Sequence, residues 1–459
     1  MSPAPHPADP TPTAAARWLP ADDPWRAAAH NEVHARPTDA VALPARVVCV
    51  AVLNAGVSRE DEWRHLRALP GGGDLPLAGL QGNFARLALP HGSVKWERHN
   101  EFTRYTLVQP LDAGTGLRGP LPDLGALVAA LALPPGWLAA IPGQTVAAIE
   151  QWLLHADVAA PAAVDVLLPR VAAWFGTKAA LVGSRVGRGH SWVLSPLQVQ
   201  ADGFERLLVL TGPDTGATRA GRTAQRLLDL ECYRLMALRG LPVAKALAPQ
   251  LSRAEQDLGD ITALLDGKAA TDAQLLDRLV ALAASVERLT AEHSYRFSAT
   301  QAYEALVSER ISELRESPLP EVQMLGEFLQ RRLAPAMATV GASARRLGML
   351  SDRVARASDL LRTRVGIATE AQNQQLLEKL TRGQELQLRL QSTVEGLSIA
   401  AISYYVVSLL LYGIKAAKAA GLPVNAEIAT GALIPLVLWA VWRTIRRIHA
   451  RLHAATEPH

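Results

Sequence analysis

The stretch TVEGLSIAAISYYVVSLLLYGIKAAK, residues 393–418, decides how the C-terminal part of this chain folds. Residues 396–414 within it are nineteen consecutive residues without a formal charge. A helix of that length measures roughly 28 Å, which matches the hydrocarbon core of a bilayer. A soluble helix of this length normally has a charged face, and this one has no charge before Lys415. We therefore predict a transmembrane helix, with a buried helical hairpin as the alternative.

A second apolar segment, residues 422–442, follows after a short loop. Pro423 suits the first turn of a helix, and Trp439 and Trp442 are typical of the aromatic belt at a membrane surface. Pro435 would kink this helix, which membrane proteins tolerate. The two segments together predict a C-terminal two-helix transmembrane hairpin.

Basic residues around the two segments predict their orientation. The loop between them has only Lys415 and Lys418, whereas the outer flanks are richer in basic residues: Lys379, Arg382, Arg389, Arg443, Arg446, Arg447 and Arg451. Because cytoplasmic flanks carry the excess of Lys and Arg, both termini are expected in the cytoplasm. The expected location is a bacterial inner (plasma) membrane, crossed twice, with the lipid bilayer as a partner.

The composition indicates a globular chain. Of its 459 residues, 49% are hydrophobic and 20% are charged, which excludes a disordered protein. A net charge of +4 gives a weak field and does not call for a nucleic-acid partner. Cys49 and Cys232 lie far apart and form no disulfide framework, so a reducing compartment is expected. The Pro- and Ala-rich residues 1–20 are expected to form a disordered leader.

Proline divides the soluble part into two regions. Most of the 30 prolines lie before residue 215, and none lies between Pro249 and Pro318 or between Pro335 and Pro423. An interior proline costs a helix roughly 3 kcal/mol, so the proline-free stretches predict long helices. The predicted class is α+β: a cytoplasmic mixed α/β domain (21–215), a helical domain with a long stalk helix (216–395), the two spans (396–414 and 422–442) and a basic tail (443–459).

Local patterns predict individual elements. We expect strands at 45–53 and 101–108, a hairpin at 84–89 and 94–99, and three strands in the strings KAALVGSRV, HSWVLSPLQV and GFERLLVLTG. Helices are expected at 58–69, 124–133, 144–156, 251–267, 272–315 and 321–333, the first capped by Ser58. From 336 to 395 a helix is expected, which four glycines would bend or break: Gly341, Gly348, Gly366 and Gly383.

An apolar stripe in this last region predicts a partner. It consists of Leu376, Leu380, Leu386, Leu390, Val394 and Leu397. Such a stripe is typical of a coiled coil, so a homo-oligomer is expected.

Two short strings hold the candidate binding residues. In HNEVH and the following residues, Glu32, His34 and Arg36 either bind a ligand or fix the chain before Pro37, and a metal held by His30, Glu32 and His34 is the sharper alternative. In VKWERHNEF, strand alternation places Lys95, Glu97 and His99 on one face and Val94, Trp96 and Arg98 on the other. Lys95, Arg98 and Arg104 would suit an anion or a partner, and a half-buried strand with a solvated face is the alternative.

Polar and small residues of the first span form a stripe of their own. Its members are Ser398, Ala401, Tyr405, Ser408, Tyr412 and Lys415. This stripe is either a pore lining or a helix-packing face, since small and hydroxyl residues let membrane helices approach closely. The spans contain no carboxylate inside the apolar runs, which removes the usual proton relay.

The motifs for catalysis and nucleotide binding are missing. GSRVGRGH (183–190) lacks the spacing of a dinucleotide-binding loop, and FGTK (175–178) lacks the glycine of a phosphate loop. Cys232 has no histidine near it in sequence and is expected in the core. Glu231 and Arg234 are expected to pair on a helix surface, and Arg296, Arg310, Arg331 and Arg332 to form the charged face of a bundle. We therefore expect no enzyme, no cofactor and no metal.

Several longer strings resemble a known family. They are NEVHARP (31–37), KWERHNEFTRYT (95–106), LECYRLMALRGLPVA (230–244), YRFSATQAY (295–303), QNQQLLEKL (372–380) and LRLQSTVEGLSIAAISYY. Together they look like an uncharacterised bacterial membrane-anchored family, a domain of unknown function with two C-terminal spans. The resemblance covers nearly the whole chain and implies its location and architecture without an activity.

The layout also resembles that of CorA-type magnesium channels: a cytoplasmic α/β domain, a long helix, two spans and a basic tail. That family carries Gly-Met-Asn after the first span, where this chain has Tyr412, Gly413, Ile414 and Lys415. A ring of Lys415 would oppose cations. The sequence thus favours a non-enzymatic, membrane-anchored scaffold or regulator whose cytoplasmic domain binds an unidentified ligand or protein. A CorA-like ion channel or transporter without the Gly-Met-Asn motif is the alternative.

Overall fold

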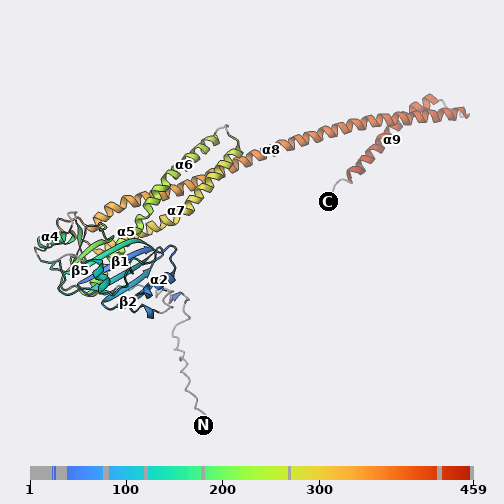
Figure 1. Ribbon diagram of the computed structural model, residues 1–459. Helices are drawn as coiled ribbons and strands as arrows, with labels where there is room; N and C mark the ends of the chain where they lie inside the picture. Colours follow the sequence, from blue (N-terminus) through green and yellow to red (C-terminus); the bar gives the residue numbers. More distant parts are fainter. Residues whose placement is uncertain are drawn as a thin grey trace, which may run out of the picture. The chain divides into compact units, whose positions relative to one another are not determined.

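The structure is a computed structural model that describes residues 23, 25–26, 39–75, 82–117, 122–160, 162–176, 181–266, 270–420 and 426–454. The predicted leader (1–20) and the candidate residues Glu32, His34 and Arg36 lie outside the described residues, as does His30. By its contacts the chain divides into two compact units, residues 1–269 with 277–355, and residues 270–276 with 356–459. Figure 1 shows the elements in order along the chain.

The first unit contains all the described strands and most of the described helices. The strands are β1 (Ala45–Leu53), β2 (Phe84–Leu89), β3 (Gly92–Arg98), β4 (Phe102–Pro110), β5 (Gln144–His155), β6 (Val182–Val186), β7 (Ser191–Ser195) and β8 (Glu205–Thr211). The helices are α2 (Arg59–Arg67), a 3-10 turn η1 (Gly72–Asp74), α3 (Leu124–Ala130), α4 (Ala163–Phe175), α5 (Ala217–Leu238), α6 (Gly240–Asp266), α7 (Asp272–Leu314), α8 (Leu325–Ala419) and α9 (Ala426–Ala454). The first residues of α7 (272–276), α8 from residue 356 onwards and all of α9 belong to the second unit.

The strands form one eight-stranded sheet in the order β2-β3-β4-β1-β5-β8-β7-β6. All neighbours pair antiparallel except β5 and β8, which pair parallel. β1 lies in the middle and is apolar on both faces, as expected for a strand that is covered on both sides. Together with the long helices that follow, this sheet confirms the predicted α+β class.

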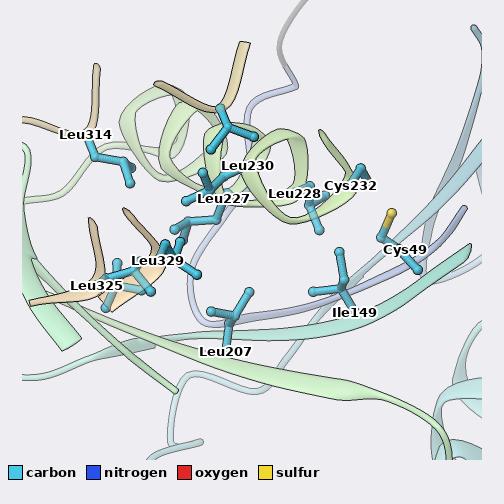
Figure 2. Packing of buried hydrophobic residues seen from close by; sticks show 14 of the residues in the cluster. Cys49, Ile149, Leu207, Leu227, Leu228, Leu230, Cys232, Leu314, Leu325 and Leu329 are labelled. Carbon is cyan, nitrogen blue, oxygen red and sulfur yellow. The ribbon is translucent and has the colours of Figure 1, made fainter. Parts of the chain in front are cut away.

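Helices cover both faces of the sheet. On one face, alternate strand residues such as Val48, Trp96 and Tyr105 pack with Trp63 of α2 and Leu127 of α3. On the other face, the intervening residues pack against α5 and the first turns of α8. Figure 2 shows Cys49, Ile149 and Leu207 pointing from the strands towards Leu227, Leu228 and Cys232 of α5, with Leu314, Leu325 and Leu329 alongside. α4 covers the β5-β8-β7 end of the first face with its own apolar cluster.

Several local predictions are confirmed. Ser58 caps α2, and its hydroxyl accepts a hydrogen bond from the Asp61 N–H. The predicted hairpin is formed by β2 and β3, and the first predicted strand is β1. The expected break at the four stalk glycines is not found, since α8 is one continuous helix of 95 residues.

One secondary-structure prediction is wrong. Residues 144–156 were expected to form a helix, but residues 144–155 form β5, which lies between β1 and β8. The alanines Ala147 and Ala148 and the spacing of the apolar residues resemble a helix. Two strand neighbours and a helix layer on each face bury this segment, and tertiary packing overrides the weak helix propensity.

One close contact fixes α5 against the chain that leads into β1. A Cβ atom on Gly221 would lie 1.8 Å from the carbonyl oxygen of Asp39. The Val41 N–H also donates to the carbonyl oxygen of Ala217. Only glycine allows this crossing, which positions the first turns of α5 over the sheet.

Two helices are long and apolar enough to cross a membrane. They lie in α8, up to residue 417, and in α9, residues 427–447. In both helices, only a small share of the most apolar stretch is buried by the rest of the described chain. The first predicted segment, 396–414, lies in α8, and residues 426–442 of the second lie in α9, whereas residues 422–425 are outside the described part of the chain.

Candidate functional site

The candidate site begins with charged side chains on the α5 face of the sheet. Glu97 of β3 lies opposite Arg104 of β4, and Lys95 lies opposite Thr106. Strand alternation therefore places Lys95, Glu97 and Arg104 on one face. These side chains are only 2–3% exposed, because α5 lies over them. The charged face of VKWERHNEF is therefore covered, which corrects the alternative that it is solvated.

The buried charges are joined in a closed ring. Arg104 donates to Glu97 Oε2 from Nη2 (2.6 Å) and to Asp229 Oδ1 from Nη1 (2.6 Å). Gln225 Nε2 donates to the same Asp229 oxygen at 2.8 Å, and Lys95 Nζ donates to Gln225 Oε1 at 2.6 Å. Lys95 Nζ lies 3.4 Å from Glu97 Oε2 and closes the ring. Two cations and two carboxylates balance, which makes the burial of all four tolerable.

The ring fixes the ionisation of its members. Burial alone would lower the pKa of Arg104, but Asp229 and Glu97 raise it well above its ordinary value. Burial alone would raise the pKa of Glu97, but Arg104 and Lys95 bring it below its ordinary value. Both side chains therefore stay charged at neutral pH.

A cavity of about 380 Å³ lies above this ring, between the sheet, α5 and α7. We call it the Arg104 pocket; it is lined by Glu97, His99, Arg104, Arg222, Gln225, Arg226, Asp229, Tyr233, Arg310 and Glu313. Arg310 of α7 donates to Glu313 Oε2 at 2.5 Å and lies 3.5 Å from Asp229 Oδ2. Arg226 Nε donates to the same oxygen of Glu313 at 3.2 Å. The walls are thus charged and held by ion pairs.

Aromatic residues close one side of the pocket. The His99 ring stacks on Phe102 with the ring centroids 4.4 Å apart. Tyr233 stacks on Tyr303 at 5.9 Å and meets Phe102 edge-on. Burial, with Asp229 nearby, raises the pKa of Tyr233 to about 12. Its hydroxyl stays protonated at neutral pH and is able to donate a hydrogen bond.

The sequence model of the DUF3422 family, whose members are described as proteins of unknown function, matches residues 21–452. This chain belongs to the DUF3422 family. The expected membership of a family without an assigned activity is confirmed. The matched region includes the Arg104 pocket and both apolar helices of this DUF3422 protein. No curated protein matches the chain.

The structure brings together three of the predicted binding residues, Lys95, Glu97 and His99. It separates Arg98 from them. Arg98 lies on the opposite face of β3 and forms an ion pair with Glu62 of α2 (2.6 Å). Glu62 also accepts a hydrogen bond from Thr103, so Arg98 belongs to the contact between the sheet and α2.

The sequence prediction missed the α5 side of the pocket. Arg222, Gln225, Arg226, Asp229 and Tyr233 recur at steps of three and four, which places them on one helix face. This polar stripe beside the leucines of α5 was the available signal. Arg310 was predicted to lie on the face of a bundle, and the structure places it in the pocket wall instead.

Two buried thiols lie below the ring. Cys49 of β1 and Cys232 of α5 are both fully buried and belong to the same cluster. Burial would raise the pKa of Cys49, but the Cys232 thiol and Arg104 bring it below its ordinary value. The hydrogen bond to Cys49 raises the pKa of Cys232 well above its ordinary value. The expected place of Cys232 in the core is what the structure has.

A second buried group of charges lies farther along α5. Glu231 and Arg234 pair as expected, but Glu231 is buried, so this is not a surface pair. Arg234 also lies 3.2 Å from Glu205 of β8. Burial and the neighbouring Glu231 raise the pKa of Glu205 to about 8. One guanidinium cannot balance two buried carboxylates, so at neutral pH the pair holds one proton.

The predicted stripe of the first span lies along α8. Tyr405, Tyr412 and Lys415 are exposed, and Ser398 and Ser408 are partly exposed. Ser403, which lies outside this stripe, is the buried residue of the first span. The two tyrosines and the lysine of this stripe are therefore left uncovered by the described residues.

The described residues contain no group of three or more His, Cys, Asp or Glu side chains able to hold a metal ion. The residues of the hypothetical HNEVH metal site lie outside this part of the chain.

Proposed function

We propose that this DUF3422 protein is a membrane-anchored regulator that binds a small polar ligand in the Arg104 pocket and does not catalyse a reaction. The observation that carries this proposal is the course of α8 along the chain. Its first turns contribute Leu325, Leu329 and Leu333 to the core against the sheet, and the same helix contains the apolar segment 396–414. One continuous helix therefore contributes to both the proposed binding domain and the proposed anchor.

The anchoring part of the proposal rests on charge and length. Both apolar helices are long enough to span a bilayer, and the basic residues lie outside their uncharged runs, residues 396–414 and 428–442. Arg443 and Arg446 lie over the rings of Trp439 and Trp442 at 5.0 and 4.7 Å, an arrangement suited to a membrane surface. The protein would cross a bacterial inner membrane twice, with both termini in the cytoplasm.

The binding part rests on the state of the charged groups. Each acidic residue that lines the pocket is engaged by an arginine: Glu97 and Asp229 by Arg104, and Glu313 by Arg310. Glu97 is held ionised below its ordinary pKa, so it is unsuited to deliver a proton. The thiol with the lowered pKa, Cys49, is buried and does not line the pocket. These groups suit recognition better than acid–base or nucleophilic chemistry.

The anchoring test uses the full-length protein. Alkaline carbonate should leave the protein in the membrane pellet. A reporter active only in the cytoplasm should give signal when fused after His459 and none when inserted near Ala419. Release of the protein by carbonate would overturn the anchor, and the reverse reporter pattern would overturn the orientation.

An oligomeric ion channel is the second candidate. The continuity of α8 favours it, because a helix of 95 residues would couple the soluble unit directly to a pore lined by Ser398, Tyr405 and Ser408. The mass of the detergent-solubilised protein distinguishes the candidates. A ring of four or more subunits would support a channel, whereas a monomer or dimer would leave no closed pore.

A further inference from the structure

The floor of the Arg104 pocket is electrically balanced. Lys95 and Arg104 offset Glu97 and Asp229, and all four are joined by the hydrogen bonds of the ring. Because each buried charge has an opposite charge in contact, the floor needs no ligand to remain stable.

The wall of the pocket is not balanced. Arg226 and Arg310 share one carboxylate, Glu313, and both use the same oxygen of it. Arg310 also approaches Asp229, which Arg104 already neutralises. Arg222 lines the pocket and has no hydrogen bond or ion pair with any residue in the described part of the chain. Among the described residues, three wall arginines face one wall carboxylate, which leaves an excess of two positive charges.

We infer that the Arg104 pocket binds a small dianion that presents several oxygen atoms, such as a phosphate group or a dicarboxylate. This inference rests on the proposed binding function and names the class of its ligand. Arg222, Arg226 and Arg310 would hold the dianion. The Nη atoms of Arg226 and Nη2 of Arg310 have no partner among the residues described, so they keep donors to offer. Planar guanidinium groups match phosphate and carboxylate oxygens with paired hydrogen bonds.

The size and the other polar groups of the pocket restrict the ligand further. A volume of about 380 Å³ lies at the lower end of the range for small-molecule sites, so the ligand has few atoms beyond the anionic group. Tyr233, protonated at neutral pH, also lines the pocket and is able to bind a ligand hydroxyl or a further oxygen.

The test measures thermal unfolding of the full-length protein in detergent at constant ionic strength, with sodium chloride as the baseline. The probes are inorganic phosphate, succinate and glucose. Phosphate or succinate should raise the unfolding midpoint in a concentration-dependent way, since a ligand that binds the folded state stabilises it. Arg222→Gln should weaken the apparent affinity about tenfold, the value of one charge-assisted contact. Arg226→Gln should do the same.

Arg219→Gln is the matched control. Arg219 is an exposed arginine of the same helix, three residues before Arg222, and does not line the pocket. Its variant should bind like the wild type. A response to phosphate alone would assign a phosphate group, and a response to succinate alone a dicarboxylate.

Three outcomes would overturn the inference. The first is no shift with either anion beyond chloride. The second is a shift that survives both Arg222→Gln and Arg226→Gln. The third is a shift with glucose alone, which would leave the proposed binding function intact and reject only the charge of the ligand. Carbonate extraction reads the anchor independently of all three.

Discussion

The two compact units each contain side chains in an unusual place. In the first unit, Lys95, Glu97 and Arg104 are 2–3% exposed between the sheet and α5. In the second unit, Leu376, Leu380 and Leu390 of α8 are 58, 56 and 69% exposed. Charges are thus inside in one region and leucines outside in the other.

The difference lies in whether each side chain has a partner. Each charge of the buried ring, Lys95, Glu97, Arg104 and Asp229, is in contact with an opposite charge, so its burial is compensated. The leucines of α8 are largely exposed, and few described side chains pack against them. A contiguous exposed apolar surface normally marks a contact with a membrane or another protein. The buried ring finds its partners within the chain, and the exposed leucines do not find theirs among the described residues.

The largest effect is expected when the buried charges lose their partner. Arg104→Met leaves Glu97 and Asp229 buried without their shared cation, which should destabilise the protein by about 3–5 kcal/mol. Urea unfolding followed by tryptophan fluorescence measures this change in the free energy of unfolding.

Arg331→Met is the control for that experiment. Arg331 forms an exposed pair with Glu327 on α8, and its loss should change stability by less than about 0.5 kcal/mol. If Arg104→Met unfolded at the same urea concentration as the wild type, the buried ring would contribute nothing to stability.

A smaller effect is expected at the Glu205–Glu231 pair, and it depends on pH. The pKa of Glu205 rises from 4.5 to about 8 on folding, because of burial and Glu231. Between these two pH values the folded state holds a proton that the unfolded chain has lost. The free energy of unfolding therefore falls as the pH rises through this window. Glu205→Gln should remove most of this loss, which urea midpoints at about pH 5 and about pH 9 would show.

Glu309→Gln serves as the comparison, since Glu309 is an exposed side chain of α7 and has no carboxylate partner of this kind. Equal pH profiles for the wild type and Glu205→Gln would mean that the two carboxyls do not share a proton.

The smallest effect on unfolding is expected on the exposed leucines. The double variant Leu380→Gln with Leu390→Gln should change the stability of the first unit by less than about 0.5 kcal/mol, because neither side chain packs in its core. If another copy covers the stripe, the wild type should have a mass of at least two 49.2 kDa chains in detergent, and the variant a lower one.

Lys379→Gln changes an exposed side chain beside the leucine stripe of α8 and should leave the mass unchanged. A wild type of one chain would show that the stripe is not an interface between copies.

The accuracy of the sequence predictions follows the range of the interactions involved. The Ser58 cap, the β2–β3 hairpin and the two apolar helices were predicted correctly, because each depends on residues close together in the chain. Residues 144–155 were assigned wrongly, since only their strand neighbours β1 and β8 decide their conformation. The sequence analysis named the pocket residues Glu97, His99 and Arg104 as candidates, but it missed the larger part that α5 and α7 contribute.

The sequence by itself determined the alternation that places Lys95 and Glu97 on one face of β3, and the uncharged run that makes residues 396–414 a possible span. Both follow from the period of a strand or the length of a helix. Only the tertiary structure brought Asp229 to Arg104 from 125 residues away, and placed Arg310 beside Asp229 in the same pocket. Packing of α5 and α7 on the sheet sets these contacts, and no local pattern records which charges will meet or which of them stay unbalanced.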